Sequence, residues 1–219
     1  MGSPYGTAER AKKFLNYTTC AKSGNGGGFL PVPTLPVILP FMPVQLKQLV
    51  RAILEEYALP QQGVHGVSHW ARVLENGIRL AKVTNANIEV VQLFAVLHDA
   101  KRENEAVDDD HGRRGAEYAA RLRGDLFDLP DHDFNLLYTA CAQHTDGLVE
   151  ADITIQTCWD ADRLDLGRVE IEPEPQKLCT DAAKKPAMLK WADRRACFQI
   201  VPEIISRDWG IDTFGWGEM

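Results

Sequence analysis

Histidines and aspartates at separate points of this chain could together bind a divalent metal ion. His69 lies in SHWARV, the pair His98-Asp99 lies in FAVLHDA, and Asp162 lies in WDADRLD. Neutral imidazoles and carboxylates are ligands that borderline divalent transition metals accept. Neighbouring helix residues project about 100° apart, so His98 and Asp99 could approach one ion from different angles. The carboxylate of Asp99 would keep a second oxygen for another ion.

Two further histidines, His111 in DDDHGRRG and His144 in AQHTDG, lie between the second and third of these stretches. Each also has an ordinary explanation: His111 as an exposed residue at a helix start, and His144 as a charge at a helix end. Asp160 and Asp165 compete with Asp162, and Asp160 and Asp162 would point about 200° apart on a helix. The gaps are long and uneven, so such ligands must come from separate helices around one cavity.

Composition and charge restrict the classes of function. The chain has 219 residues, 45% of them hydrophobic, which is enough for one domain with appendages. A formal net charge of -7 argues against a nucleic-acid polymer as partner, although a small anionic substrate remains compatible. Five scattered cysteines without CxxC spacing favour reduced thiols and a cytoplasmic location.

The first 43 residues form an irregular segment that is rich in glycine and proline. SGNGGG predicts a flexible joint, and no secretory signal is recognisable. The apolar run 29–44 contains five prolines, which break any helix and therefore argue against a membrane span. We expect an extended strap across the surface, with the docking of a partner as the alternative.

From residue 44 to 219 the hydrophobic periodicity is helical, and no alternating strand pattern of useful length occurs. We therefore predict an all-α domain. An acidic loop, 103–110, leads into the helix that begins at about 111. The predicted helices are 44–59, a helix from Ser68 as cap to about 83, a very apolar helix capped by Asn87 that ends at His98-Asp99, 111–122, 131–144 closed by Gly147, 152–166, and 184–207 with a kink at Pro202.

The order His69, His98-Asp99, Asp162 resembles the H…HD…D motif of the HD-domain superfamily of metal-dependent phosphohydrolases. His69 to Val73 is similar to the family's HxxRV, and Ala161 to Leu164 to its ADRL. The resemblance covers roughly residues 45–170, with the motif core at about 65–170, and implies an HD-domain helical bundle. His111 and His144 resemble the additional ligands of two-metal members. HTDG at His144 resembles the HTxG segment of members that cleave dinucleoside polyphosphates.

This resemblance implies a phosphohydrolase that acts on a nucleotide or other small phosphate ester through one or two divalent ions (Mn, Fe, Co, Ni or Zn). Asp99 would bridge or orient the attacking water, and Glu103 is the candidate general acid. Lys101, Arg102 and Arg163 are the candidates for binding substrate and stabilising charge, and a solvated helix end is the ordinary alternative for them. Of the remaining histidines, His65 is expected in a solvated loop, with contact to a bound phosphate as the alternative, and His132 on the surface.

Two departures from the family pattern leave other functions open. Many relatives carry an acid three positions after the motif aspartate, where this chain has Arg102, and oxygenase-type members often carry a lysine there. This chain has Lys101 one position earlier, so neither familiar substrate assignment follows directly. The first alternative is a di-iron oxygenase, because the inositol and aminophosphonate oxygenases resemble this six-ligand pattern. The second is a non-catalytic helical binding module with a structural metal, which predicts a closed coordination sphere. The expected partner is a small phosphorylated substrate without nucleic acid or membrane, and a homo-oligomer is an alternative to a monomer.

Overall fold

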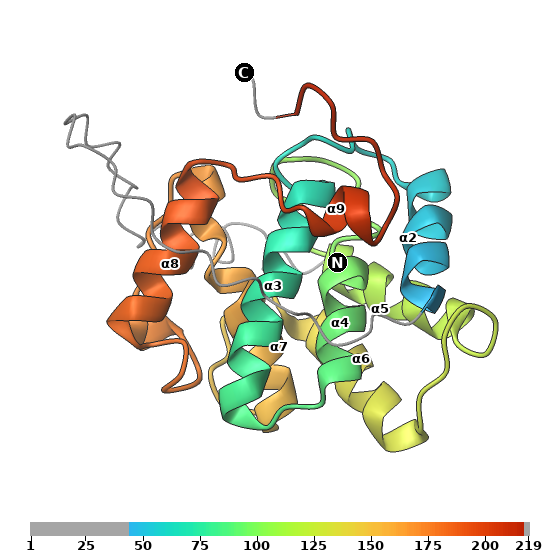
Figure 1. The fold of residues 1–219 in the computed structure, drawn as a ribbon. Helices are drawn as coiled ribbons and strands as arrows, with labels where there is room; N and C mark the ends of the chain where they lie inside the picture. Colours follow the sequence, from blue (N-terminus) through green and yellow to red (C-terminus); the bar gives the residue numbers. More distant parts are fainter. Residues whose placement is uncertain (1–43, 217–219) are drawn as a thin grey trace, which may run out of the picture.

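The structure of the protein is a computed structural model that describes residues 44–216. These residues form eight α-helices and two short 3₁₀-helices, and they contain no strand (Figure 1). The predicted all-α fold class is therefore confirmed. No helix in this range is long and apolar enough to cross a membrane. The predicted glycine- and proline-rich segment, 1–43, lies outside the described residues.

Helix α4 (Ile88–Leu97) occupies the centre of the fold. It packs against α3 (Val67–Thr84), α6 (Asp131–Gln143) and α7 (Ile153–Arg163), and α3 also packs along α7 (Figure 1). All its residues from 90 to 97 are buried. A helix that is apolar on almost every side can bury all of its apolar surface only in the middle of a bundle. The sequence IEVVQLFAVL thus places the end of α4, and the His-Asp pair after it, inside the protein.

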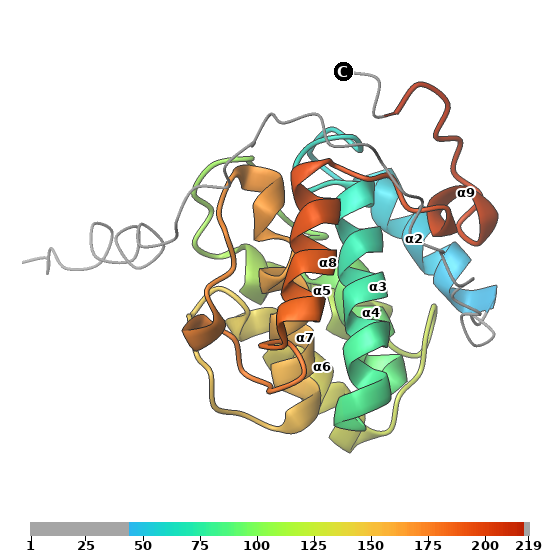
Figure 2. The ribbon, with the colours of Figure 1, turned by 60° about the vertical axis from the view of Figure 1, so that its left-hand side comes forward.

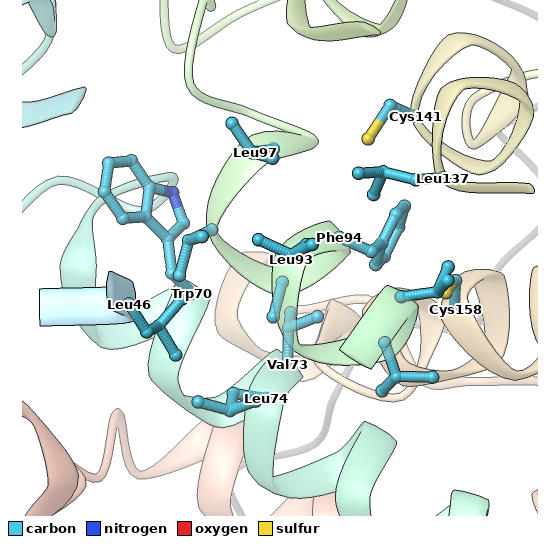
Figure 3. Close-up of a cluster of buried hydrophobic side chains, with 14 of the residues drawn as sticks. Leu46, Trp70, Val73, Leu74, Leu93, Phe94, Leu97, Leu137, Cys141 and Cys158 are labelled. Carbon is cyan, nitrogen blue, oxygen red and sulfur yellow. The ribbon is translucent and has the colours of Figure 1, made fainter. Parts of the chain in front are cut away.

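The hydrophobic core lies on both sides of α4. Phe94 of α4 points toward Leu137 and Cys141 of α6, whereas Trp70 and Val73 of α3 lie on the other side of the helix (Figure 3). All five side chains are fully buried. Close packing of this kind fixes the relative positions of helix ends, because a packed core resists small displacements.

The remaining helices cover the edges of this bundle. Helix α2 (Val44–Glu56) packs against α4, and α5 (His111–Leu122) packs mainly against α6. Figure 2 shows α8 (Pro186–Cys197) beside α3, where it also contacts the 3₁₀-helix η1 (Leu166–Val169). The short α9 (Ile204–Arg207) packs against α3, and the second 3₁₀-helix, η2 (Pro175–Lys177), precedes α8.

Three predicted helix starts can be compared with the structure. The side chain of Asn87 accepts hydrogen bonds from the backbone N–H groups of residues 89 and 90, and Asp152 accepts one from Thr154, so both predicted caps are confirmed. The predicted Ser68 cap is wrong, because α3 begins at Val67 with Gly66 as N-cap. A Cβ atom on Gly66 would lie 2.2 Å from the backbone oxygen of Gln61, so the tight turn before α3 determines its start.

The predicted C-terminal helix, 184–207, is wrong as a single element. Helix α8 ends at Cys197, and Gln199 takes a left-handed conformation with φ of 48°. The break therefore precedes Pro202, and only a short α9 follows it. The predicted helix 152–166 likewise ends earlier, at Arg163, before η1.

Candidate metal centre

Five helices bring the six predicted metal ligands into one buried cluster. His69 lies in the first turn of α3, His98 and Asp99 directly follow α4, His111 begins α5, His144 follows α6, and Asp162 lies in the last turn of α7. The ligand atoms form three overlapping groups, and within each group they lie within 4.8 Å of one another. The groups are His69/His98/Asp99, His98/His144/Asp162 and Asp99/His111/His144.

Two glycines of the HGRRG segment allow α5 to approach the other helix ends. A Cβ atom on Gly115 would lie 2.7 Å from the backbone oxygen of Leu97 and 2.8 Å from that of His98. One on Gly112 would lie 2.6 Å from the backbone oxygen of Cys141. Because backbone atoms cannot move aside cheaply, any larger residue would push His111 away from the cluster.

The first pair of imidazoles is His69 and His98. His69 Nδ1 donates to Asp165 Oδ2 over 2.8 Å, and His98 Nδ1 donates to the Phe94 backbone oxygen over 3.1 Å. Both acceptors lack a proton of their own, so in the neutral imidazole each Nε2 carries a lone pair. These two Nε2 atoms lie 3.1 Å apart.

The second pair, His111 and His144, repeats this arrangement. His144 Nδ1 donates to the Cys141 backbone oxygen over 2.7 Å, and His111 Nδ1 contacts the Asp108 backbone oxygen. The two Nε2 atoms lie 2.9 Å apart. Metal-bound histidines usually donate their other ring N–H to a carboxylate or a backbone carbonyl in this way.

The carboxylate of Asp99 lies between the two pairs. Its Oδ2 is 3.6 Å from Nε2 of both His69 and His98, whereas its Oδ1 is 3.1 Å from Nε2 of His111 and 3.7 Å from that of His144. Oδ1 is buried without a hydrogen-bond partner. Asp162 Oδ1, which belongs to the group with His98 and His144, also lies close to the first pair, at 3.4 Å from His69 Nε2 and 3.7 Å from His98 Nε2. Facing lone pairs and an unpartnered carboxylate oxygen repel one another unless a cation lies among them, so these residues fit divalent ions.

The protonation states agree with such a site. Burial lowers the pKa of His69 to about 3 and that of His98 to about 4, so both are neutral imidazoles at pH 7. Burial would raise the pKa of Asp99, but His98 and the neighbouring imidazoles of His111 and His144 hold it well below its usual range. For His144, burial lowers the pKa, yet Asp99 and Asp162 outweigh that effect and raise it. The cluster therefore attracts positive charge.

Asp165 and Arg72 form a supporting layer that the sequence analysis did not predict. Besides holding His69, the buried Asp165 accepts hydrogen bonds from Arg72 Nε at 2.7 Å and Nη2 at 3.0 Å. It follows Asp162 by one helical turn, which is the sequence feature that could have indicated it. Asp160, the alternative last ligand, points elsewhere: it accepts from the backbone N–H groups of Cys179 and Thr180.

His65 was expected in a solvated loop, and the structure corrects this. Its side chain is buried, and its Nδ1 lies 2.5 Å from Glu105 Oε2. The His65 ring meets the His69 ring edge-on, with centroids 6.3 Å apart. His65 thus links the loop before α3 to the acidic loop beside the cluster. The explanation of His111 as an exposed residue is also wrong, because His111 is buried.

Of the predicted catalytic and substrate-binding residues outside the ligand set, Arg102 reaches the cluster. Its Nη1 lies 3.1 Å from His111 Nε2 and 3.8 Å from Asp99 Oδ1. Lys101 instead pairs with Glu56 at 2.5 Å and, with Glu103, lines a cleft of about 330 Å³ between α2 and α5.

Arg163 lies apart from the cluster. Its guanidinium donates to the backbone oxygens of Lys177, at 3.1 Å, and Leu148, at 2.7 Å. The side chain is buried there over the Trp159 ring. This placement argues against the predicted substrate-binding role of Arg163.

Comparisons with known proteins add the following. Neither a scan of protein-family models nor a search of curated proteins found a match. Among solved structures, the chain is similar to the crystal structure of a predicted HD superfamily hydrolase from an uncultured Thermotogales bacterium. The two chains are 29% identical, with a TM-score of 0.51, and the similarity covers 76% of this chain and 90% of that one.

This similarity and the clustered motif residues point to the same family. The chain is similar to an HD superfamily protein in fold, and its His/Asp cluster is consistent with an HD site. The family resemblance of the sequence is thereby confirmed, together with the HD-type fold. The His and Asp groups of this HD-type fold fit a divalent metal site.

Proposed function

We propose that this protein with an HD-type fold is a metal-dependent phosphohydrolase that acts on a nucleotide or another small phosphate ester. Hydrolysis is supported by the similarity to a predicted HD superfamily hydrolase. The observation that carries the proposal is the position of Asp99, whose two carboxylate oxygens face two separate pairs of histidine Nε2 atoms. A shared carboxylate suits two neighbouring ions, and two-metal sites are common in enzymes that hydrolyse phosphate esters.

The proposed ligands divide into two positions. His69, His98, Asp99 Oδ2 and Asp162 would hold one ion, and His111, His144 and Asp99 Oδ1 would hold the other. Bound divalent ions supply Lewis acidity and a water molecule whose pKa lies near neutrality. This donor set of nitrogen and oxygen suits Mn, Fe, Co, Ni or Zn.

The chain's own residues would prepare the site for hydrolysis. Asp99 and Asp162 are ionised, because their histidine neighbours lower both carboxyl pKa values despite burial. Asp165 fixes the His69 ring through Nδ1, so that the lone pair on Nε2 stays directed into the cluster. The Arg102 guanidinium adds a positive charge next to Asp99, where it could interact with the oxygens of a phosphoryl group. The predicted role of Glu103 as general acid has less support, because its side chain pairs loosely with Arg114 at 3.6 Å.

Two alternatives predict different measurements. A di-iron oxygenase would use the same six ligands, but iron would co-purify with it and turnover would consume oxygen. A binding module with a structural metal requires a closed coordination sphere. Against that alternative, the Asp162 side chain is 15% exposed while those of His69 and His98 are fully buried, so the cluster is accessible from the Asp162 side.

The test is a screen of phosphorylated metabolites with metal-reconstituted protein, combined with elemental analysis and measurement of oxygen uptake. We expect phosphate release from one class of substrates in the presence of Mn, Co or Ni. Asp99→Asn should abolish it, whereas His132→Ala, which changes an exposed histidine, should not. Oxygen consumption with iron and without phosphate release would replace the proposal by the oxygenase alternative.

A further inference from the structure

The two proposed ion positions differ in the charge around them. The position at His69 and His98 has two carboxylates, through Asp99 Oδ2 and Asp162 Oδ1. The position at His111 and His144 has the single Asp99 oxygen Oδ1 within 3.7 Å, and Asp162 lies farther away, within 4.8 Å of His144. Because it has two carboxylates close by instead of one, the first position offers more negative charge to a divalent ion than the second.

The second position also has a cation of the protein's own beside it. Arg102 Nη1 lies 3.1 Å from His111 Nε2, 3.2 Å from His111 Nδ1 and 3.8 Å from Asp99 Oδ1. These contacts involve two of the atoms that a second ion would need. At the first position such a charge is more distant: Arg168 pairs with Asp165 at 3.9 Å and acts on Asp162 only at longer range, and no Lys or Arg nitrogen in the described part of the chain forms an ion pair with Asp162.

Arg102 cannot move away from this place easily. Its Nε donates to the backbone oxygen of Asn104 at 3.0 Å, and its Nη2 donates to that of Ala106 at 2.6 Å. The residue is only 8% exposed. An arginine stays charged at every relevant pH, so this charge is permanent.

We infer that Arg102 acts as an internal counter-cation at the second ion position and makes the two positions fill unequally. The first ion binds tightly at His69, His98, Asp99 and Asp162. The second ion binds more weakly at His111 and His144, because it must share Asp99 with the guanidinium and is repelled by it. Electrostatic repulsion over such distances in a partly desolvated site is large enough to separate the two affinities by at least about tenfold. The occupancy of the second position thus changes with the metal concentration, while the first position remains occupied.

This inference rests on the proposed metal centre but not on phosphate-ester hydrolysis, and it can be tested without turnover. The experiment titrates metal-free protein with Mn²⁺ and follows free Mn²⁺ by electron paramagnetic resonance. Arg102→Gln removes the charge, and Arg102→Lys keeps a charge while losing the guanidinium contacts to the acidic loop. Arg113→Gln is the matched control, because it removes an exposed positive charge from the same region.

We expect the wild-type protein and Arg113→Gln to bind one ion at least about tenfold more tightly than the second. Arg102→Gln should bind the second ion more tightly and narrow this gap, whereas Arg102→Lys should retain most of it. Two equal affinities in the wild-type protein would overturn the inference. So would a gap that is unchanged or wider in Arg102→Gln. If both Arg102 variants lower the affinity for the second ion equally, the contacts with the acidic loop matter rather than the charge. The inference is then also wrong. Absence of phosphatase activity would count against the proposed function alone.

Discussion

The Nε2 atoms of His69 and His98 lie 3.1 Å apart inside the protein, and neither carries the proton that could join them. The Nδ1 proton of each ring is already donated, to Asp165 and to the Phe94 backbone oxygen respectively. Two buried lone pairs at this distance destabilise the metal-free protein, because polar groups that lose water without gaining a partner are costly. A cation between them removes that cost.

Metal binding should therefore stabilise the fold. At a free metal concentration of about 100 times the Kd, a ligand that binds only the folded state raises the free energy of unfolding by about 2.7 kcal/mol. We expect an increase of this size when Mn²⁺ is added to metal-free protein, measured by urea unfolding. In the His98→Ala variant the increase should largely disappear. Equal unfolding curves of the wild-type protein with and without metal would show that the cluster does not bind it.

Removing His144 should affect the second position first. His144→Ala deletes one of the two imidazoles beside Asp99 Oδ1 and leaves His69, His98 and Asp162 in place. We expect one ion per chain instead of two after reconstitution with metal in excess, by elemental analysis. Exposed His132 provides the matched control, and its alanine variant should keep both ions. An unchanged stoichiometry in His144→Ala would mean that this histidine is not a ligand.

Asp165 should matter for metal affinity although it is not among the proposed ligands. Asp165→Asn removes the charge that fixes the His69 ring and that pairs with Arg72. Changes of such supporting residues typically cost about 10–100-fold in metal affinity. We expect a loss in this range for the first ion, measured by competition with a chelator. Asp128→Asn, at an exposed carboxylate, should leave the affinity unchanged. If Asp165→Asn binds the first ion as tightly as the wild-type protein does, the hydrogen bond to His69 has no such role.

The pKa values predict acid sensitivity of the metal-free protein. Burial lowers the pKa of His69 to about 3 and of His98 to about 4, below their ordinary value of 6.5. As the pH falls below 6.5, these histidines bind protons in the unfolded chain but remain neutral in the folded protein. The free energy of unfolding therefore decreases. His65, whose pKa burial also lowers, acts in the same direction, whereas the raised pKa values of His144, Asp160 and Glu75 act in the opposite direction. We expect urea unfolding to show a continuous loss of stability from pH 6.5 to pH 4, with a smaller slope for His69→Gln. A constant stability over this interval would contradict the protonation states described above.

The sequence was sufficient to predict the helices around the site and the ligand set that the fold brings together. The helical periodicity, the caps at Asn87 and Asp152 and the nearly all-apolar α4 are local features, and they correspond to the structure. Residue types alone did not select the ligands. The choice of Asp162 over Asp160 depended on the family resemblance, and the structure places Asp162 with the histidines.

What the sequence did not indicate depends on contacts between distant segments. His65 is buried and pairs with Glu105, which lies forty residues later in the chain. Arg163 is held by backbone oxygens of two loops, although its position in the motif suggested a substrate-binding role. The break before Pro202 involves the left-handed Gln199. Periodicity within a single segment contains no information on any of these interactions.

The number of metal ions per chain tests the central claim most directly. Elemental analysis of protein reconstituted with metal should give two ions for the wild-type chain. Asp99→Ala should retain essentially none, because Asp99 serves both positions, and His98→Ala should lose the ion of the tighter position. Circular dichroism would confirm that these variants remain helical. Two retained ions in Asp99→Ala, together with an intact fold, would contradict a centre built on this shared carboxylate.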